Sequence, residues 1–339
     1  MTEQDLDHIL THTRELWDEV RGQRLFITGG TGFLGRWLVE SFSYINAKLD
    51  LKAALTVLSR DPGAFKLRAP GLCADPAVTF CKGDIRTFAF PDKDHSFIIH
   101  GAASVGDRSS GEDSLAMFET IAGGTARALD FASKTRCRKF LFISSGAVYG
   151  RQPPEIARIP ESYTGGPDTM EPGSAYGEGK RAAELLCSAF HKNDPAFEPK
   201  IARCFAVVGP HMPLDSHLAI GNFIRDAAAG GPIRIKGDGT PLRSYLYAAD
   251  VAAWLWTILF RARPCRPYNV GSGDPVSILE TAQAVAGLAA APVSVTVAGA
   301  PAGGPPQRYI PDVSRAELEL GLTAKIGLKD AITRTMKGA

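Results

Sequence analysis

Short apolar runs alternate along this chain with longer stretches in which apolar residues recur at helical spacing. The runs are bounded by polar residues, as in buried parallel strands, and they lie at 24–28, 53–58, 78–81, 96–100, 139–144, 201–207 and 268–270. Helical spacing predicts helices at 5–20, 33–46, 113–134 and 175–191. This alternation predicts an α/β fold, in which helices cover both faces of a doubly wound parallel sheet through right-handed crossovers.

The last third of the chain has a different pattern. Its predicted elements are shorter, and residues 286–306 are rich in proline and small residues. We interpret this stretch as a mobile loop of a smaller lobe that is interleaved with the main domain. The predicted division is an N-terminal helix at 1–21, a main domain at 22–205 with 240–272 returning to it, and the smaller lobe at 206–239 and 273–339.

Composition and charge exclude several classes of protein. The 339 residues carry a formal net charge of +2 and no long basic run, so no nucleic-acid partner is expected. The longest apolar run, 251–260, is about half as long as a membrane span, and the acidic first residues are unlike a signal peptide. The six cysteines form no C-x-x-C pair or zinc-binding spacing, which favours reduced thiols, a cytoplasmic location and no metal site.

A glycine-rich turn, Thr28-Gly29-Gly30-Thr31-Gly32-Phe33-Leu34-Gly35, joins the first predicted strand to the helix that follows it. Gly29, Gly32 and Gly35 are spaced as G-x-x-G-x-x-G. Because these residues lack side chains, the backbone can approach a pyrophosphate, which then binds to the free N–H groups at the helix N-terminus. The position of the turn between a strand and a helix predicts a dinucleotide site.

Two further stretches carry candidate catalytic side chains. Tyr176 and Lys180 form a Y-x-x-x-K pair at the start of a predicted helix, so both side chains lie on one face, one turn apart. A nearby ammonium stabilises the phenolate and lowers the pKa of tyrosine from its usual value of about 10, which makes the phenol a usable acid or base. The strand at 139–144 ends in Ser144 and Ser145, at the edge where open α/β sheets bind ligands.

Together these stretches resemble the extended short-chain dehydrogenase/reductase family, which comprises nucleotide-sugar epimerases, dehydratases and 4-ketoreductases. The resemblance covers nearly all of residues 22–339. It also rests on Gly83-Asp84-Ile85, His100-Gly101-Ala102-Ala103, Val148-Tyr149-Gly150, 243–247 with Asp250, and 268–272. It implies a Rossmann fold with a substrate-binding C-terminal lobe and a nucleoside diphosphate sugar as substrate. It also implies a homodimer formed through the helices at 113–134 and 175–191.

The resemblance also implies roles for individual residues. Ser145 would hydrogen-bond the reacting sugar oxygen, Tyr176 would exchange the proton, and Lys180 would support the tyrosine and hold the nicotinamide ribose. The other implied cofactor-binding residues are Gly29, Gly32, Phe33, Leu34, Gly35, Ser59, Arg60, Asp84, Ile85, Ala102 and Ala103. The implied substrate-binding residues are Ser104, Asn222, Phe223, Arg243 and Arg308. Thr120 replaces an asparagine that is usual in the family, which weakens the case for side-chain support of the cofactor there.

The end of the second predicted strand bears on the choice of cofactor. An NAD-specific site places a carboxylate there for the ribose 2′-OH, whereas this chain has Ser59 followed by Arg60. A hydroxyl and a guanidinium suit a 2′-phosphate, because arginine can bind it bidentately. We therefore favour NADP. The alternative is NAD, with Asp61 reaching back to the ribose.

Gly146 and Ala147 reduce the number of reactions that are expected of this chain. By the resemblance, members that dehydrate the sugar carry an Asp-Glu pair after the catalytic hydroxyl. Glycine and alanine have no titratable group, so 4,6-dehydration is disfavoured and hydride transfer at C4 remains. The favoured reaction is that of a 4-ketoreductase; the alternatives are a 4-epimerase with tightly bound NAD, a ketoreductase of a non-sugar substrate and a non-catalytic NADP sensor. The loop histidines His211 and His217 are interpreted as solvated rather than as an extra acid or base.

Overall fold

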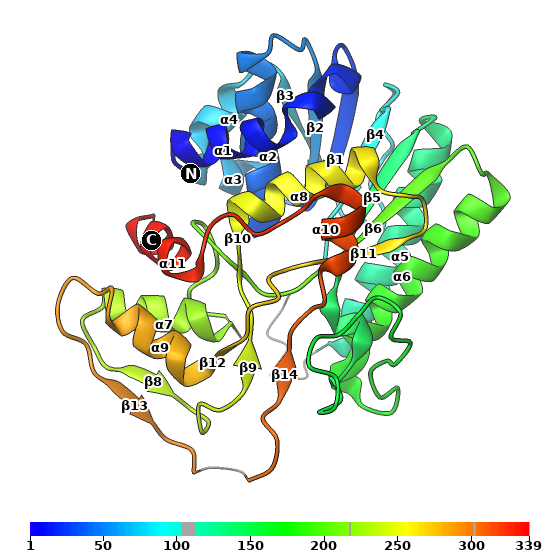
Figure 1. The fold of residues 1–339 in the computed structure, drawn as a ribbon. Helices are drawn as coiled ribbons and strands as arrows, with labels where there is room; N and C mark the ends of the chain where they lie inside the picture. The colour runs from blue at the N-terminus through cyan, green and yellow to red at the C-terminus, as the bar shows by residue number, and fades with distance from the viewer. Residues whose placement is uncertain (104–112, 217, 301–302, 339) are drawn as a thin grey trace.

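The computed structural model describes residues 1–103, 113–216, 218–300 and 303–338. Seven strands form the central sheet in the order β11-β6-β5-β4-β1-β2-β3 (Figure 1). Along the chain they are β1 (Arg24–Thr28), β2 (Ala54–Ser59), β3 (Val78–Lys82), β4 (Phe97–His100), β5 (Lys139–Ser145), β6 (Glu198–Cys204) and β11 (Pro267–Val270). All neighbouring pairs are parallel, which confirms the predicted fold class. The strand order reverses at β1, between β2 and β4, and such a reversal opens a ligand-binding crevice at the carboxyl ends of the strands.

Helices cover both faces of this sheet (Figure 1). On one face lie α2 (Phe33–Lys48) and α8 (Ala248–Arg261), and on the other lie α5 (Ser114–Lys134) and α6 (Ala175–Asn193). Alternate residues of β1 serve the two faces. Leu25 and Ile27 belong to the core with α2 and α8, whereas Phe26 packs on Phe131 of α5 with 4.8 Å between ring centroids. Burial on both faces explains why these strands are continuous apolar runs.

The N-terminal segment forms a shorter α-helix than the pattern predicts. Helix α1 (Glu3–Thr13) is followed by a 3₁₀ helix at Arg14–Val20. The Thr13 hydroxyl donates to the Ile9 carbonyl at 2.6 Å and accepts from the Trp17 indole at 3.0 Å, and the Thr13 backbone leaves helical geometry. The tighter winding still buries Trp17 and Val20 against the core, so the apolar pattern is kept while the helix type changes.

The strand predicted at 201–207 is divided in the structure. Strand β6 ends at Cys204, and β7 (Val207–Val208) pairs instead with β10 (Leu246–Tyr247) in a separate two-stranded sheet. The division occurs because the Phe205 N–H still bonds to the Val270 carbonyl, whereas the Ala206 carbonyl accepts from Leu246. The chain therefore changes partners at this point and leaves the main sheet toward the smaller lobe.

The smaller lobe lies beside the carboxyl ends of the strands (Figure 1). It contains α7 (Ala219–Ala228), α9 (Ile278–Ala286), the paired strands β8 (Ile233–Ile235) and β13 (Val295–Val297), and the three-stranded sheet β12 (Val276–Ser277), β9 (Leu242–Arg243) and β14 (Arg308–Tyr309). The stretch predicted as a mobile loop thus includes β13, which the β-branched residues Val295, Thr296 and Val297 favour. Two helices end the chain, α10 (Ser314–Leu320) against β11 and α11 (Leu328–Lys337) against β10. Two short helices, α3 (Pro62–Arg68) and α4 (Pro70–Ala74), follow β2.

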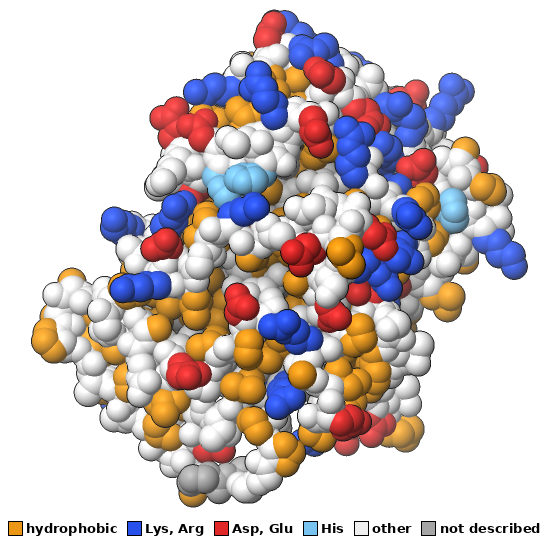
Figure 2. All heavy atoms as spheres, viewed as in Figure 1, with side chains coloured by type: hydrophobic (Ala, Val, Ile, Leu, Met, Phe, Trp, Pro, Cys, Tyr) orange, Lys and Arg blue, Asp and Glu red, His pale blue; other side chains and the backbone are white. Residues whose placement is uncertain are grey.

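Charged side chains of both signs are interspersed over the face drawn in Figure 2. This distribution agrees with the small net charge of the chain. Within the described residues, no helix combines the length and the apolar character that crossing a membrane requires.

Candidate active site

A cavity of about 2520 Å³ runs along the carboxyl ends of β1 to β5 and continues between the sheet and the smaller lobe. Its wall contains all of the predicted site residues that the structure describes: Gly29, Gly32, Phe33, Leu34, Gly35, Ser59, Arg60, Asp84, Ile85, Ala102, Ala103, Ser145, Tyr176, Lys180, Asn222, Phe223, Arg243 and Arg308. Ser104, predicted to bind substrate, lies outside the described residues, as does His217. The fold therefore brings together residues that span almost 280 positions of sequence.

The glycine turn after β1 is shaped by close backbone contacts. Gly29 has a φ of +74°, and a Cβ there would lie 2.7 Å from the Ala102 nitrogen. A Cβ on Gly35 would lie 2.1 Å from the Gly29 carbonyl oxygen. Gly32 is the N-cap of α2, which has no acidic residue in its first turn to compete with an anion. This bare backbone against a helix N-terminus fits a dinucleotide pyrophosphate.

A buried histidine, missed as a functional residue by the sequence reasoning, ties this turn to the next strand. The Thr28 hydroxyl accepts from the Ala102 N–H at 3.1 Å and lies 2.7 Å from His100 Nδ1. The other ring nitrogen lies 3.0 Å from the Thr125 hydroxyl, which donates to the Ile121 carbonyl. These bonds require a neutral ring with the proton on Nε2, and burial agrees by lowering the pKa of His100 to about 3.

Asp84 and Ile85 lie at the expected adenine end of the cavity. The Asp84 carboxylate receives a bidentate pair of bonds from Arg86, at 2.9 and 3.1 Å, and this bonding lowers the pKa of the carboxyl. Ile85 packs against α5, where a Cβ on Gly124 would lie only 2.9 Å from its side chain. The glycine in α5 thus allows the apolar wall of this subsite to lie close to the helix.

The end of β2 presents a hydroxyl and a guanidinium to the same cavity. Ser59 is the last residue of the strand and is buried, and Arg60 beside it is exposed. Arg68 and Arg86 also line the cavity, although the sequence reasoning did not include them, and Arg86 is paired with Asp84. Asp61 does not line it, because its carboxylate caps α3 by accepting from the Ala64 N–H at 3.0 Å. The alternative in which Asp61 reaches the ribose therefore requires this helix cap to be broken.

The candidate catalytic residues come from β5 and α6. Ser145 ends β5, and its hydroxyl accepts from the Ala147 N–H at 3.2 Å, which leaves the hydroxyl proton available to a ligand. Tyr176 lies in the first turn of α6, and Lys180 follows one turn later, with its ammonium 5.8 Å from the tyrosine ring centroid. Lys180 is buried and donates to the Ile143 carbonyl at 2.7 Å. This bond holds the lysine between the strand end and the helix.

Gly146 has no space for a side chain. A Cβ there would lie 2.6 Å from the Tyr309 hydroxyl and 2.7 Å from the Phe205 ring, two aromatic groups whose centroids are 4.6 Å apart. Ala147, the next residue, also lines the cavity. The position where dehydrating relatives are expected to carry an acid is therefore closed by aromatic side chains as well as lacking a titratable group.

The smaller lobe contributes the cations of the predicted substrate site. Arg243 of β9 is half-buried, and burial lowers the pKa of its guanidinium, yet it forms no ion pair with any carboxylate of the described residues. Its Nη1 donates to the Leu242 carbonyl at 2.8 Å. Strand β14 brings Arg308 beside β9, in a register that pairs Tyr309 with Arg243. A desolvated cation without a carboxylate partner suits an anionic ligand such as a diphosphate.

Asn222 and Phe223 lie on α7, opposite these strands. Phe223 is buried in the core of the lobe and still contributes to the cavity wall. The Asn222 amide donates to the Ser216 carbonyl at 2.9 Å, and its carbonyl accepts from Arg225. These bonds orient the amide at the mouth of the predicted nucleotide pocket.

Two other polar groups near the site have no place in the proposed chemistry. His211, predicted to be solvated, is half-buried against the Met1 amine and Glu40, and burial lowers its pKa to about 4. It does not line the cavity. Cys204 does line the cavity, but burial raises the pKa of its thiol to about 12, so it is not a nucleophile near neutral pH.

The parallel sheet, the glycine turn and the Ser–Tyr–Lys set are those of an extended short-chain dehydrogenase/reductase. A family model described as the NAD dependent epimerase/dehydratase family matches residues 25–271, and the chain belongs to this family. The match ends with β11, so most of the smaller lobe's C-terminal part lies beyond it.

Sequence identity to individual relatives is low. The chain is 28% identical over 309 residues to UDP-glucuronic acid decarboxylase 6 from Arabidopsis thaliana, with 91% of this chain and 86% of that protein covered. Among solved structures, MoeE5 in complex with UDP-glucose and NAD is 26% identical, with a TM-score of 0.77 over 93% of this chain and 98% of that one. The UDP-glucuronic acid 4-epimerase from Bacillus cereus, in complex with UDP-glucuronic acid and NAD, is 23% identical; its TM-score of 0.78, over 93% and 98% of the two chains, shows the shared fold.

Proposed function

We propose that this protein is a 4-ketoreductase that reduces a 4-keto nucleoside diphosphate sugar with NADPH. Membership of the family and the names of the relatives support a nucleotide sugar as substrate. Arg243, which pairs with no carboxylate in the described part of the chain, and the neighbouring Arg308 support the same class, because both line the cavity and suit a diphosphate.

The observation that carries the choice of a reductase is the end of β2. Ser59 and Arg60 end β2 and line the cavity, whereas Asp61 caps α3 and does not line it. A hydroxyl and a guanidinium at the strand end, with the Asp84 carboxylate of the same cavity already paired with Arg86, favour a 2′-phosphate over a 2′-hydroxyl. An enzyme that consumes its cofactor must exchange it in every cycle, which agrees with an exposed Arg60.

The chain's own groups can complete the reduction. A bound nicotinamide would supply the hydride. We assign to Ser145 the hydrogen bond to the carbonyl oxygen at C4 and to Tyr176 the transfer of the proton to the same oxygen, since both residues line the cavity. Lys180, held by Ile143, supplies the positive charge that stabilises the tyrosine once its proton has left. The aromatic pair of Phe205 and Tyr309 excludes an additional acid at position 146.

A 4-epimerase with tightly bound NAD is the second candidate. The solved structures of MoeE5 and of the Bacillus cereus 4-epimerase, both in complex with NAD, favour it. The same three residues serve both reactions, because an epimerase removes and returns hydrogen at one carbon. The two candidates differ in whether the cofactor leaves.

One experiment separates the candidates. The purified protein is assayed for bound nicotinamide and then incubated with UDP-sugars and with 4-keto-6-deoxy nucleotide sugars, with and without NADPH. The reductase predicts little bound cofactor and NADPH consumption only with a keto sugar. Stoichiometric, tightly held NAD together with interconversion of C4 epimers would overturn the reductase and establish the epimerase.

Replacing Arg60 is expected to affect NADPH selectively. Arg60→Ala is expected to weaken NADPH binding by about 1.5–3 kcal/mol, the scale of a hydrogen bond to a charged group. NADH binding is the internal control and is expected to change little, because it has no phosphate for Arg60 to hold. Ser59→Asp is expected to reverse the preference through repulsion of the phosphate and a new bond to the ribose hydroxyl. Equal losses for both cofactors in a fluorescence titration would contradict this assignment.

We also propose that α5 and α6 form a homodimer interface. Their outer surfaces expose Leu115 at 70%, Leu185 at 70% and Phe118 at 37%, a cost that a partner copy would remove. Pairing the two helices with their counterparts would bury more than about 1,000 Å² in total, as stable interfaces do. Leu185→Glu is expected to give a monomer in sedimentation at micromolar concentration. Leu318→Glu on α10, where the leucine is 85% exposed, is the matched control and is expected to remain dimeric. A monomeric unmodified protein would refute the interface.

A further inference from the structure

A row of polar residues crosses three neighbouring strands at the catalytic end of the sheet. Ser144 of β5 is paired with Arg203 of β6, which is paired with Asn269 of β11. Ser144 and Asn269 are buried, and the Arg203 side chain is 14% exposed. Since paired residues of adjacent strands share a face, the three side chains project to the same side of the sheet. Polar groups in such a position must be satisfied by one another or by their neighbours.

One half of the network joins this row to the helix that carries Tyr176 and Lys180. The Ser144 hydroxyl donates to Glu184 at 2.5 Å, and Arg203 donates to the same carboxylate through Nε and Nη2, the shorter bond being 2.6 Å. Glu184 lies on α6 one turn beyond Lys180 and two turns beyond Tyr176. The Ser144 bond therefore connects β5, the strand of Ser145, to the face of the helix that bears the other two catalytic candidates, and the ion pair connects β6 to the same face.

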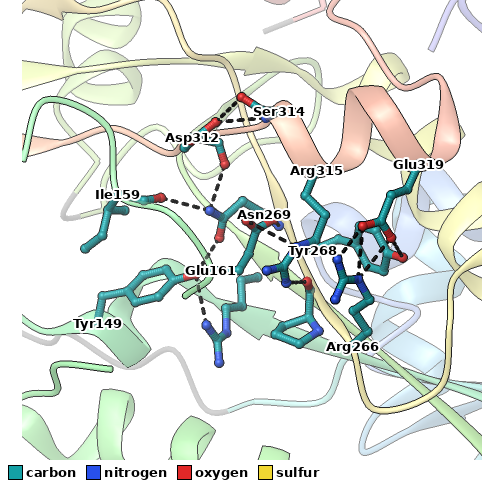
Figure 3. Close-up of polar contacts among 12 residues, drawn as sticks. Tyr149, Ile159, Glu161, Arg266, Tyr268, Asn269, Asp312, Ser314, Arg315 and Glu319 are labelled. Atoms are coloured by element: carbon teal, nitrogen blue, oxygen red, sulfur yellow. Dashed lines mark hydrogen bonds and ion pairs between the residues drawn. The ribbon is translucent and has the colours of Figure 1, made fainter. Parts of the chain in front are cut away.

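The other half joins the row to the C-terminal segment. Arg203 Nη1 donates to the Tyr149 hydroxyl at 2.9 Å, and that hydroxyl donates to Asn269 Oδ1 at 2.8 Å. The Asn269 amide then donates to the carbonyls of Ile159 and Asp312 at 3.0 and 2.9 Å (Figure 3). Burial raises the pKa of Tyr149 to about 12, so this hydroxyl remains a donor at physiological pH. Each donor has its acceptor, and the orientation of the amide is thereby determined.

We propose that Arg203 is a positioning residue that holds the catalytic end of β5 from both sides. Its Nε and Nη2 bind Glu184, which also accepts from Ser144, and its Nη1 binds Tyr149, so Ser145 lies between two residues that the network holds. Through Glu184 the same guanidinium sets the position of Tyr176 and Lys180 relative to Ser145. Through Tyr149 and Asn269 it couples that geometry to Asp312, three residues after Tyr309, which lines the cavity.

The test uses a variant that removes one hydroxyl from the network. Tyr149→Phe leaves Arg203 Nη1 and Asn269 Oδ1 without their bond. It is expected to lower kcat by about 10- to 100-fold, the scale of a misplacement of catalytic groups, with a smaller change in the Kd of the cofactor, because the glycine turn and the end of β2 lie outside the network. Tyr247→Phe is the matched control: Tyr247 is also buried, its hydroxyl bonds to Asp5 at 3.1 Å, and like Tyr149 it does not line the cavity, but it has no bond to Arg203 or Asn269. A kcat within about twofold of this control would overturn the proposal.

The kcat measurement rests on the proposed function, because it needs a substrate. A second measurement therefore uses no substrate. Hydrogen exchange of Tyr149→Phe is expected to quicken at 144–150, at 157–161 and at 309–313, which are remote in sequence but joined by Asn269, whereas Tyr247→Phe leaves them unchanged. Arg203→Lys keeps the positive charge but loses the branched guanidinium that bonds to Glu184 and Tyr149 together. It is expected to produce the same exchange pattern, and it replaces Tyr149→Phe in the test if that variant does not fold. Exchange that rises only around the substituted residue, or equally along the chain, would overturn the coupling. If the wild-type protein turns over no nucleotide sugar, the proposed function fails while the exchange result still decides this inference.

Discussion

Tyr176→Phe is expected to lower kcat by about a hundredfold or more, the usual scale for a lost general acid. The variant keeps the ring, which lies in the first turn of α6 beside Lys180, and removes only the hydroxyl that would transfer the proton. Cofactor binding is expected to remain close to that of the unmodified protein, because the glycine turn and the β2 end are untouched. Turnover and cofactor titration on the same preparation measure the two effects separately.

A matched control for this variant is available on α2. Tyr44→Phe also removes a tyrosine hydroxyl that bonds to a side chain, that of Asp7, and Tyr44 does not line the main cavity. It is expected to leave kcat unchanged. An unaltered rate in Tyr176→Phe would remove this residue from the mechanism, and an equal loss in both variants would indicate a general effect on stability.

Gly35→Ala is expected to abolish cofactor saturation at concentrations that saturate the unmodified protein. The added methyl would lie 2.1 Å from the Gly29 carbonyl and 2.5 Å from the Gly30 Cα, and both contacts are with backbone that cannot rotate away. Relief requires the turn to move from α2, which withdraws the N–H groups that the pyrophosphate needs. Overpacking of this kind also costs about 1–3 kcal/mol of folding stability.

Gly123→Ala provides the control for this substitution. Gly123 lies inside α5, where a Cβ would meet nothing within 4 Å. Alanine is therefore expected to stabilise the helix by up to about 1 kcal/mol and to leave cofactor binding unchanged. Thermal melts and cofactor titrations of the two variants check both statements. Normal NADPH and NADH binding by Gly35→Ala would show that the turn does not hold the dinucleotide.

Structural features that depend only on residues close together in the sequence could be predicted from it. The apolar runs predicted the parallel sheet, because strands buried on both faces cannot alternate with polar residues. The glycine turn and the Tyr176–Lys180 spacing are equally local, since three or four residues determine each geometry. Even so, local pattern did not distinguish the α-helix from the 3₁₀ helix at Arg14–Val20, where the Thr13 hydroxyl bonds decide the winding.

Other parts of the site depend on which distant segments pair. Arg68 of α3 and Arg86, in the segment after β3, line the same cavity as the end of β2 although they are far apart in the sequence. Tyr309 closes the space at Gly146 because β14 pairs with β9, a register set over 60 residues of intervening chain. Neither contact has a signature in the residues around it.

The sequence by itself determined the α/β class, the glycine turn between strand and helix and the Tyr176–Lys180 pair, because local spacing and burial pattern dictate each of them, while the choice of Ser145 came from the family resemblance. Only the tertiary structure decided that aromatic side chains close position 146 and that Ser144, Arg203 and Asn269 form one row. Those outcomes follow from the packing and hydrogen bonding of segments far apart in the chain. The free energy that stabilises these arrangements comes from contacts throughout the fold, so no single stretch of sequence specifies them.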